Sequence, residues 1–154
     1  MIVPVDQSNI RQAAKVHSVS WQDSHRSFCA ADFVALHTPE RQQEYLLRKI
    51  SQGSRVYMLI EDVPAGVVCV TGSVIEDLYV LPELRNKGYG TLLLKYAVSC
   101  CAGTPTLWIL ENNINAGRLY RRLGFRETGN KASINGKLAE IELALTNTEQ
   151  GETP

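Results

Sequence analysis

The alternation of apolar and polar residues along the chain predicts short strands interspersed with amphipathic helices. Short apolar runs bounded by glycine, proline or aspartate are typical of strands, and apolar residues three and four positions apart indicate one face of a helix. The predicted strands are 2–5, 56–61, 66–70, 74–81, 106–110, 125–129 and 138–145. The predicted helices are approximately 9–20, 39–51, 89–101 and 115–123. Residues 21–38 have no clear period, so no element is predicted for them.

Two helix boundaries carry residues that favour them. Thr38 precedes Pro39 and Glu40, so a side chain that can cap the helix stands directly before a proline at the first helical position. Gly124 follows the helix 115–123, where a glycine commonly ends a helix. The last strand alternates well, with Ala139, Ile141, Leu143 and Leu145 on one face.

This order of elements predicts one α/β domain with a mixed sheet. The domain takes residues 1–145, which are enough to bury a sizeable core, and no repeat or second domain is visible. Residues 146–154 are polar and lack an apolar anchor, so they are predicted to form a frayed C-terminal tail.

Composition and charge exclude several classes of protein. Hydrophobic residues make up 44% of the 154 positions, too large a share for a disordered chain. The 16 basic residues balance the 16 acidic ones, so no electrostatic footprint for nucleic acid or for an anionic membrane is visible. No apolar run approaches the roughly 20 residues that span a bilayer, and the N-terminus lacks the features of a signal peptide. We therefore expect a cytoplasmic protein, monomeric or homodimeric, with neither nucleic-acid nor membrane partners.

The cysteines do not form a metal or redox motif. They stand at Cys29, Cys69, Cys100 and Cys101, and no pair has the C-x-x-C spacing of zinc sites or thioredoxin-like proteins. We interpret them as small buried hydrophobic residues in preference to a catalytic thiol. No metal site is expected, because no three histidine, cysteine or acidic residues have ligand spacing.

The most informative segment is residues 74–94, in which an apolar strand runs through Pro82 into a basic loop and then a leucine-rich helix. Such a loop can direct several backbone N–H groups at one anion, and the helix N-terminus adds partial positive charge. Arg85 and Lys87 add full charges, and Gly88 and Gly90 allow the backbone to approach a ligand closely. The segment therefore predicts a site for a phosphorylated ligand, most simply a pyrophosphate.

Other phosphate-binding motifs fit this loop less well. A P-loop needs Lys followed by Ser or Thr directly after its last glycine, whereas Thr91 alone follows Gly90 here. A dinucleotide-binding fingerprint needs three glycines and an acidic residue at the end of a second strand. Only two glycines are present, and Glu111 belongs to the next sequence block. A glycine turn that merely joins strand to helix has no reason to carry two cations.

Two sequence blocks together resemble the GNAT superfamily of acyl-coenzyme A dependent N-acyltransferases. Residues 85–90, Arg-Asn-Lys-Gly-Tyr-Gly, resemble its Q/R-x-x-G-x-G/A motif. Residues 113–125 are similar to its N-x-x-A-x-x-L-Y-x-x-x-G-F block and match it at every specified position. The resemblance covers roughly residues 1–145, but only 74–126 is diagnostic.

The resemblance implies a fold and a cosubstrate. The fold is a mixed six- to seven-stranded sheet, splayed between its fourth and fifth strands and flanked by about four helices; those strands would be 74–81 and 106–110. Acetyl-coenzyme A would lie in the splay, with its pantetheine along the free strand edge and its pyrophosphate on the loop. The residues expected to bind it are Leu78, Tyr79, Val80, Arg85, Asn86, Lys87, Gly88, Tyr89, Gly90, Thr91, Asn113 and Tyr120. Asn113 also suits a helix N-cap, and both roles are compatible.

The reaction requires a proton acceptor and a proton donor. An alkyl ammonium has a pKa near about 10, so a base must remove its proton before the nitrogen attacks a thioester. Glu76, two residues before Leu78, stands where many relatives carry an acidic residue and is the candidate base. Asp77, predicted to point to the opposite face of the strand, is the alternative, as are a histidine from 17–37 and a water chain. Tyr120 matches the superfamily tyrosine beside the coenzyme sulfur and is the candidate donor to the leaving thiolate, although a core tyrosine would also fit.

The acceptor site is expected from the segment with least family likeness, residues 17–37. Trp21 and His25 are the candidate substrate-binding residues together with Glu76, and Trp21 resembles the aromatic wall of small-molecule GNAT enzymes. The expected function is transfer of an acetyl group from acetyl-coenzyme A to a primary amine of a small molecule. Acetylation of a protein N-terminus or lysine is the alternative acceptor, and a non-catalytic acyl-coenzyme A binding module is the alternative class.

Overall fold

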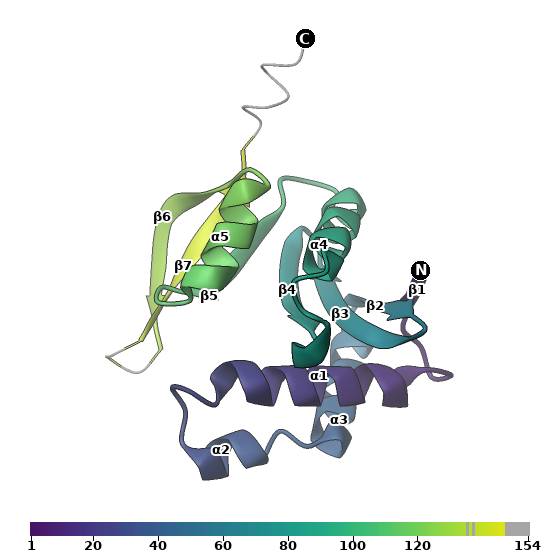
Figure 1. Cartoon of the computed structure of the whole chain (residues 1–154). Helices are drawn as coiled ribbons and strands as arrows, with labels where there is room; N and C mark the ends of the chain where they lie inside the picture. The colour runs from purple at the N-terminus through teal and green to yellow at the C-terminus, as the bar shows by residue number, and fades with distance from the viewer. Residues whose placement is uncertain (135, 137, 147–154) are drawn as a thin grey trace.

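The protein is a seven-stranded mixed sheet with helices on both faces (Figure 1). The computed structural model describes residues 1–134, 136 and 138–146. The strands are β1 (Ile2–Pro4), β2 (Arg55–Glu61), β3 (Val63–Thr71), β4 (Val74–Val80), β5 (Thr106–Leu110), β6 (Phe125–Ser133) and β7 (Ala139–Leu145). The helices are α1 (Ile10–His25), α2 (Ala31–Ala35), α3 (Pro39–Ser51), α4 (Tyr89–Cys100) and α5 (Ile114–Arg122), with one 3₁₀ turn over Pro82–Leu84. The strand order is β1-β2-β3-β4-β5-β7-β6.

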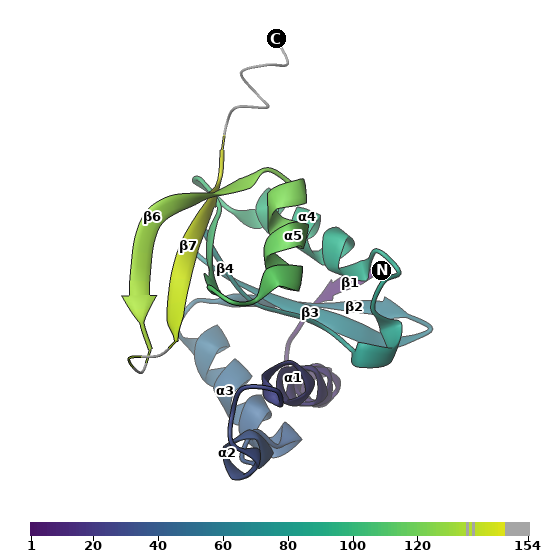
Figure 2. The ribbon, with the colours of Figure 1, turned by 60° about the vertical axis from the view of Figure 1, so that its left-hand side comes forward.

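Two hydrophobic clusters hold the helices to the sheet. Helices α1 and α3 lie on one face and α4 and α5 on the other (Figure 2). Leu46 of α3 and Leu93 of α4 are fully buried, each in its own cluster. Strand β3 separates the clusters, because Val67 faces α1 and α3 whereas Val68 faces α4. The central strands are therefore packed from both sides.

The predicted splay between the fourth and fifth strands is confirmed. Strand β4 runs parallel to β5 but pairs with it only where Val74 lies opposite Thr106. Beyond that pair the strands diverge, and the edge of β4 that faces β5 has no strand partner as far as Val80. In Figure 1 the β5–β7–β6 half with α5 stands apart from the half formed by β1 to β4. An open wedge with one free strand edge results.

The prediction that Asp77 points away from Glu76 is wrong, because β4 carries a β-bulge. Glu76 lies opposite Cys69 and Tyr79 opposite Val67, so two β4 residues face a single β3 residue between them. Asp77 takes the left-handed backbone conformation with φ 53°, which an aspartate tolerates better than most residues. The extra residue interrupts the alternation, so that Glu76 and Asp77 both point toward the α1 and α3 side of the sheet.

Three further features differ from the sequence-based expectation. Helix α1 continues to His25 instead of ending near residue 20, since ring contacts of Trp21 stabilise its last turn. Part of the segment without a period forms α2, so the described residues contain five α-helices where about four were expected, and α2 lies on the far side of α1 from the sheet (Figure 1). Strand β6 extends to Ser133. The predicted polar tail, residues 146–154, lies outside the described residues except for Thr146.

The two predicted helix boundaries are confirmed. The Thr38 side chain accepts a hydrogen bond from the backbone N–H of Arg41 at 3.2 Å, with Pro39 as the first residue of α3. Gly124 follows α5 with φ 102°, a conformation that favours glycine.

Candidate active site

A cleft of about 820 Å³ occupies the wedge between β4 and β5. Residues from Ile75 to Val80 form one wall and residues from Leu107 to Leu110 the other, and the start of α5 and the end of α1 close the ends. Of the residues predicted to bind the cosubstrate, six line this cleft: Leu78, Tyr79, Val80, Arg85, Asn113 and Tyr120. The substrate-site candidates Glu76 and His25 line it as well, whereas Trp21 does not. The splayed sheet thus brings together residues that lie far apart in the chain.

The basic loop has the geometry of an anion cradle. Gly88 is the N-cap of α4 with φ 85°, and a Cβ added there would meet no atom within 4 Å. The first hydrogen bond of α4 joins the Leu92 N–H to the Gly88 carbonyl. In the part of the chain that the structure describes, no acceptor is found for the backbone N–H groups of residues 86–91. N–H groups without an acceptor at a helix N-terminus favour a bound anion.

The two cations of the loop are placed differently. Arg85 donates from Nη1 to Asp23 Oδ2 at 2.7 Å and from Nε to the Val80 carbonyl at 3.2 Å. It therefore ties the loop to the end of α1 and to the end of β4. Lys87 is exposed and has no ion-pair partner among the described residues, so its charge is available to a phosphate.

Tyr120 and Asn113 stand on α5 at the opposite wall. The Tyr120 ring packs edge-on against Phe125, and the side chain is 8% exposed. Its hydroxyl has no hydrogen-bond partner within residues 1–134, 136 and 138–146. Burial raises the pKa of Tyr120 to about 12, so it stays a protonated phenol at neutral pH. The Asn113 side chain accepts a hydrogen bond from the Ala116 N–H, which confirms its role as the N-cap of α5.

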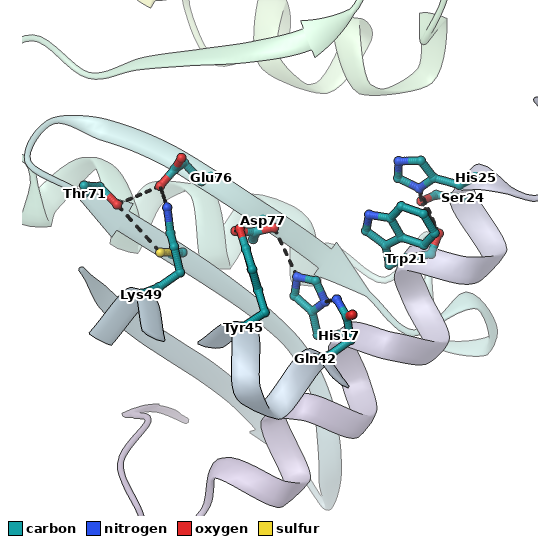
Figure 3. A network of polar contacts seen from close by, with 11 residues as sticks. His17, Trp21, Ser24, His25, Gln42, Tyr45, Lys49, Thr71, Glu76 and Asp77 are labelled. Atoms are coloured by element: carbon teal, nitrogen blue, oxygen red, sulfur yellow. Dashed lines mark hydrogen bonds and ion pairs between the residues drawn. The ribbon is translucent and has the colours of Figure 1, made fainter. Parts of the chain in front are cut away.

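Glu76 forms a polar cluster with α3 and β3. Its Oε1 atom accepts hydrogen bonds from Lys49 Nζ at 2.8 Å and from Thr71 Oγ1 at 2.6 Å. Figure 3 shows Lys49 reaching from α3 to this carboxylate. Its second oxygen has no partner among the residues described and remains able to accept a proton.

Asp77 is held by a second cluster from α1 and α3. Its oxygens lie 3.1 Å from His17 Nε2 and 2.7 Å from the Tyr45 hydroxyl, which donates to it (Figure 3). Gln42 Nε2 lies 2.9 Å from His17 Nδ1, an arrangement in which Nδ1 accepts and Nε2 donates to Asp77. Burial disfavours the ionised form, but the contacts with His17 and Tyr45 outweigh burial, so the pKa of Asp77 lies below its ordinary value. The carboxylate is therefore kept charged.

Trp21 forms an aromatic stack at the junction of α1, α2 and α3. Its ring lies between those of His25 and His37, with centroid distances of 3.8 Å and 3.5 Å. His25 Nδ1 lies 2.8 Å from the Trp21 carbonyl, which can only accept, so Nε2 is left for the cleft. Burial lowers the pKa of His25, and nearby His37 contributes in the same direction.

A second hollow of about 690 Å³ lies beside the stack. It is lined by Trp21 and His37 and by the face of α3 that carries Arg41, Tyr45 and Arg48. Asp77 borders this hollow and also the cleft between β4 and β5. The two spaces therefore meet at the bulge of β4.

Several residues of this site were missed by the sequence analysis. Trp108 on β5 and Glu140 on β7 line the cleft. Alternation could have indicated both, since their neighbours Leu107, Ile109 and Ile141 are buried on the opposite face. Tyr45 and Lys49, which hold Asp77 and Glu76, carried no signal, because their partners lie on a distant strand.

The described residues contain neither a cluster of metal ligands nor a membrane-spanning helix. Among the described residues, no group of three or more histidine, cysteine or acidic side chains is placed to hold a metal ion. None of the described helices is long and apolar enough to cross a membrane.

The splayed sheet, the glycine-containing loop before α4 and the buried tyrosine of α5 define an acyltransferase-type α/β domain. A family model described as an acetyltransferase (GNAT) domain matches residues 52–127, which include the loop and most of the cleft. Residues 52–127 therefore belong to the GNAT superfamily.

Similar proteins include acetyltransferases with different acceptors. The chain is 32% identical over 69 residues to peptidyl-lysine N-acetyltransferase YjaB of Salmonella typhimurium, a match covering 45% of this chain and 47% of the relative. It is 38% identical over 76 residues to streptothricin acetyltransferase of Streptomyces lavendulae, covering 46% and 40%. The matches thus span less than half the length of both relatives.

The fold is shared with solved structures over nearly the whole chain. The PaiA N-acetyltransferase of Thermoplasma acidophilum in complex with coenzyme A superposes with a TM-score of 0.69 at 16% identity, covering 92% of this chain and 96% of that one.

Proposed function

We propose that the protein transfers an acetyl group directly from acetyl-coenzyme A to a primary amine of a small molecule. The observation that carries this proposal is the cleft between β4 and β5, which brings Arg85 of the basic loop, a protonated tyrosine and the carboxylates of Glu76 and Asp77 together in one space. A protein that only bound acyl-coenzyme A would need the cradle and the strand edge, but not the other groups.

The cradle and the free edge of β4 suit the two polar parts of the cosubstrate. The N–H groups of residues 86–91 and the exposed Lys87 would hold the pyrophosphate. The pantetheine amides would pair with the unpaired edge of β4 near Leu78 and Val80, in the manner of an added strand. Asn113 and Tyr120 would bound the thioester end from α5. The structural neighbour crystallised with coenzyme A supports a coenzyme A-based cosubstrate.

The acceptor amine must lose a proton before it reacts. The negative charge of Asp77, stabilised by His17 and Tyr45, would attract the ammonium form. Glu76, with one carboxylate oxygen unoccupied, would take the proton directly or through water. Because of the bulge, Glu76 and Asp77 lie on one face of β4. The residue that would attract the ammonium group therefore stands next to the residue that would remove its proton.

The neutral amine then attacks the thioester carbonyl and the C–N bond forms. As the C–S bond breaks, the nitrogen releases a second proton to water, which leaves a neutral amide. A backbone N–H of the splayed β4 edge would stabilise the oxygen that becomes negative. Tyr120, which stays protonated, would give its proton or a hydrogen bond to the leaving thiolate. The Tyr120 phenolate would be restored to the phenol by solvent as the products leave.

A second acceptor class is supported by the relatives. One of them is a peptidyl-lysine N-acetyltransferase, so a lysine side chain of a protein is the second candidate acceptor. Its ε-amine presents the same chemistry as a small alkylamine and differs only in what surrounds it.

The four cysteines are free thiols, which supports a reducing compartment and hence our proposal of a cytoplasmic location.

Thiol release from acetyl-coenzyme A tests the proposal. The purified protein is assayed with a panel of small amines and with a lysine-containing peptide, and a no-amine reaction serves as control. We expect amine-dependent thiol release together with the N-acetylated product. Binding of acetyl-coenzyme A without release by any acceptor would instead assign the protein to the binding-module class.

A further inference from the structure

Only two of the carboxylates that line the cleft form ion pairs with lysine or arginine in the described chain. Four carboxylates line it: Asp23, Glu76, Asp77 and Glu140. Asp23 forms ion pairs with Arg85 at 2.7 Å and with Arg26 at 3.3 Å. Glu76 forms an ion pair with Lys49 at 2.8 Å. These two charges are compensated within the folded chain.

The other two carboxylates have no lysine or arginine partner among the described residues. Asp77 is bonded to the Tyr45 hydroxyl and to His17. The Glu140 side chain forms neither a hydrogen bond nor an ion pair within the described part of the chain. Asp77 on β4 and Glu140 on β7 both line the cleft.

An exposed aromatic ring lines the cleft on the same sheet face as Glu140. Strand β5 buries Leu107 and Ile109, so Trp108 points to the opposite face and is 37% exposed. On β7, Glu142 lies directly opposite Trp108, and Glu140, two positions along the strand, is its diagonal neighbour on the same face. An indole and a carboxylate on one face of neighbouring strands suit an alkyl ammonium, which can gain both a cation–π contact and an ion pair.

We propose that the acceptor is a small molecule with two cationic amino groups. One, the reacting group, is held at Asp77, and the other lies between Glu140 and Trp108. This inference rests on the proposed function, since it concerns the acceptor of the same reaction. It makes Glu140 and Trp108 residues that determine specificity.

Charge balance distinguishes this acceptor from the alternatives. A monoamine brings one cation to two carboxylates that have no lysine or arginine partner among the described residues, and it loses that charge when it becomes an amide. A diamine keeps one ammonium throughout the reaction, so Glu140 remains paired while Asp77 releases the product. An amino acid would bring a carboxylate toward Glu140 and would be repelled.

A matched series of four-carbon amines tests the class of acceptor. Butane-1,4-diamine, butylamine and 4-aminobutanoate share a chain length and a reacting amine but differ in charge at the far end. We expect kcat/KM to be at least about tenfold higher for the diamine than for butylamine, and lowest for 4-aminobutanoate. Equal values for diamine and butylamine, or a preference for 4-aminobutanoate, would overturn the inference.

Substitution of Glu140 tests the residue itself. Glu140→Gln should lower kcat/KM for the diamine by about tenfold, mainly through KM, and leave butylamine unaffected. Glu142→Gln is the matched control, because Glu142 stands on the same strand and face, directly opposite Trp108, but is bonded to Thr128 and Asn130 and does not line the cleft. Equal effects of the two substitutions would assign Glu140 no part in specificity.

A binding measurement separates this inference from the proposed function. Calorimetric titration of butane-1,4-diamine into the protein saturated with coenzyme A should show binding that Glu140→Gln weakens and Glu142→Gln does not. Transfer to butylamine as fast as to the diamine would sustain the proposed function and overturn the dicationic acceptor. Absence of transfer to every amine, with diamine binding retained, would overturn the proposed function alone.

Discussion

At the residue scale, the most consequential position is Asp77, because one backbone angle decides which face its side chain occupies. Period-two alternation assigns Glu76 and Asp77 to opposite faces, and that assignment is wrong. The bulge arises from the register of β4 against β3, a tertiary property that no local pattern of the segment 74–80 carries. The identity of the carboxylates could thus be predicted from the sequence, but not their arrangement.

Tyr120 provides a residue-scale test of the chemistry. Tyr120→Phe retains the ring packing on Phe125 and removes only the hydroxyl. If that hydroxyl serves the leaving thiolate, kcat should fall by roughly tenfold to a thousandfold while the affinity for acetyl-coenzyme A is unchanged. Steady-state kinetics with calorimetry measures both, and Tyr96→Phe on α4 is the control. An unchanged kcat would leave Tyr120 as a core residue and the donor role to solvent.

Glu76→Gln tests the base. Its rate should lie furthest below that of the wild type at pH values below the pKa of the amine, and the deficit should shrink as pH rises and free amine appears unaided. A pH–rate profile of Glu76→Gln parallel to that of the wild type would argue against the base role.

The substitution Asp77→Asn should instead raise KM for a cationic acceptor, because it removes the negative charge that attracts the ammonium group.

His25 should make stability depend on pH near neutrality. Burial lowers its pKa in the folded protein below the value of about 6.5 expected in the unfolded chain. The unfolded chain therefore binds the proton more readily, so stability is fully present above about pH 6.5 and is lost as pH falls through the folded-state pKa. Urea unfolding between about pH 7.5 and 5.5 should show a decline that is shallower in His25→Phe. Equal slopes would show that His25 does not contribute.

At the element scale, the functional unit is the passage from β4 through the loop into α4. Its sequence predicts an anion site, and two observations support that prediction: the N–H groups of residues 86–91 have no acceptor in the described chain, and Gly88 takes a positive φ. Long apolar runs and the Thr38 and Gly124 caps were also sufficient to place most helices and strands. The last turn of α1 and helix α2 could not be predicted, because they depend on ring contacts among Trp21, His25, Phe33 and His37.

Gly88→Asp tests this element, with Gly88→Asn as the matched control. Both side chains have nearly the same shape, their Cβ would meet no atom within 4 Å, and both face the same backbone strain, so they differ mainly in charge. Gly88→Asp should weaken coenzyme A binding at least tenfold more than Gly88→Asn, which corresponds to about 1.4 kcal/mol. Calorimetry on the folded variants measures the difference. Equal affinities would remove the loop from the binding site.

At the scale of the whole molecule, function depends on two halves of a sheet that part after a single residue pair. The half formed by β1 to β4 supplies the loop, Glu76 and Asp77, and the half with β5, β7 and β6 supplies Trp108, Glu140 and, through α5, Tyr120. The splay could be anticipated from the family resemblance, but the charges that face each other across it could not. They come from segments more than sixty residues apart, so only the folded chain reveals that Asp77 and Glu140 border one cleft.

A single-turnover experiment tests the central claim of direct transfer most directly. Excess protein is mixed with coenzyme A that carries a labelled acetyl group and with butane-1,4-diamine, and the reaction is stopped at successive times. The account predicts that label appears in the N-acetylated diamine at the rate at which free thiol appears, with none attached to the protein. Thiol release that leaves the label bound to the protein, or no release while acetyl-coenzyme A is bound, would contradict it.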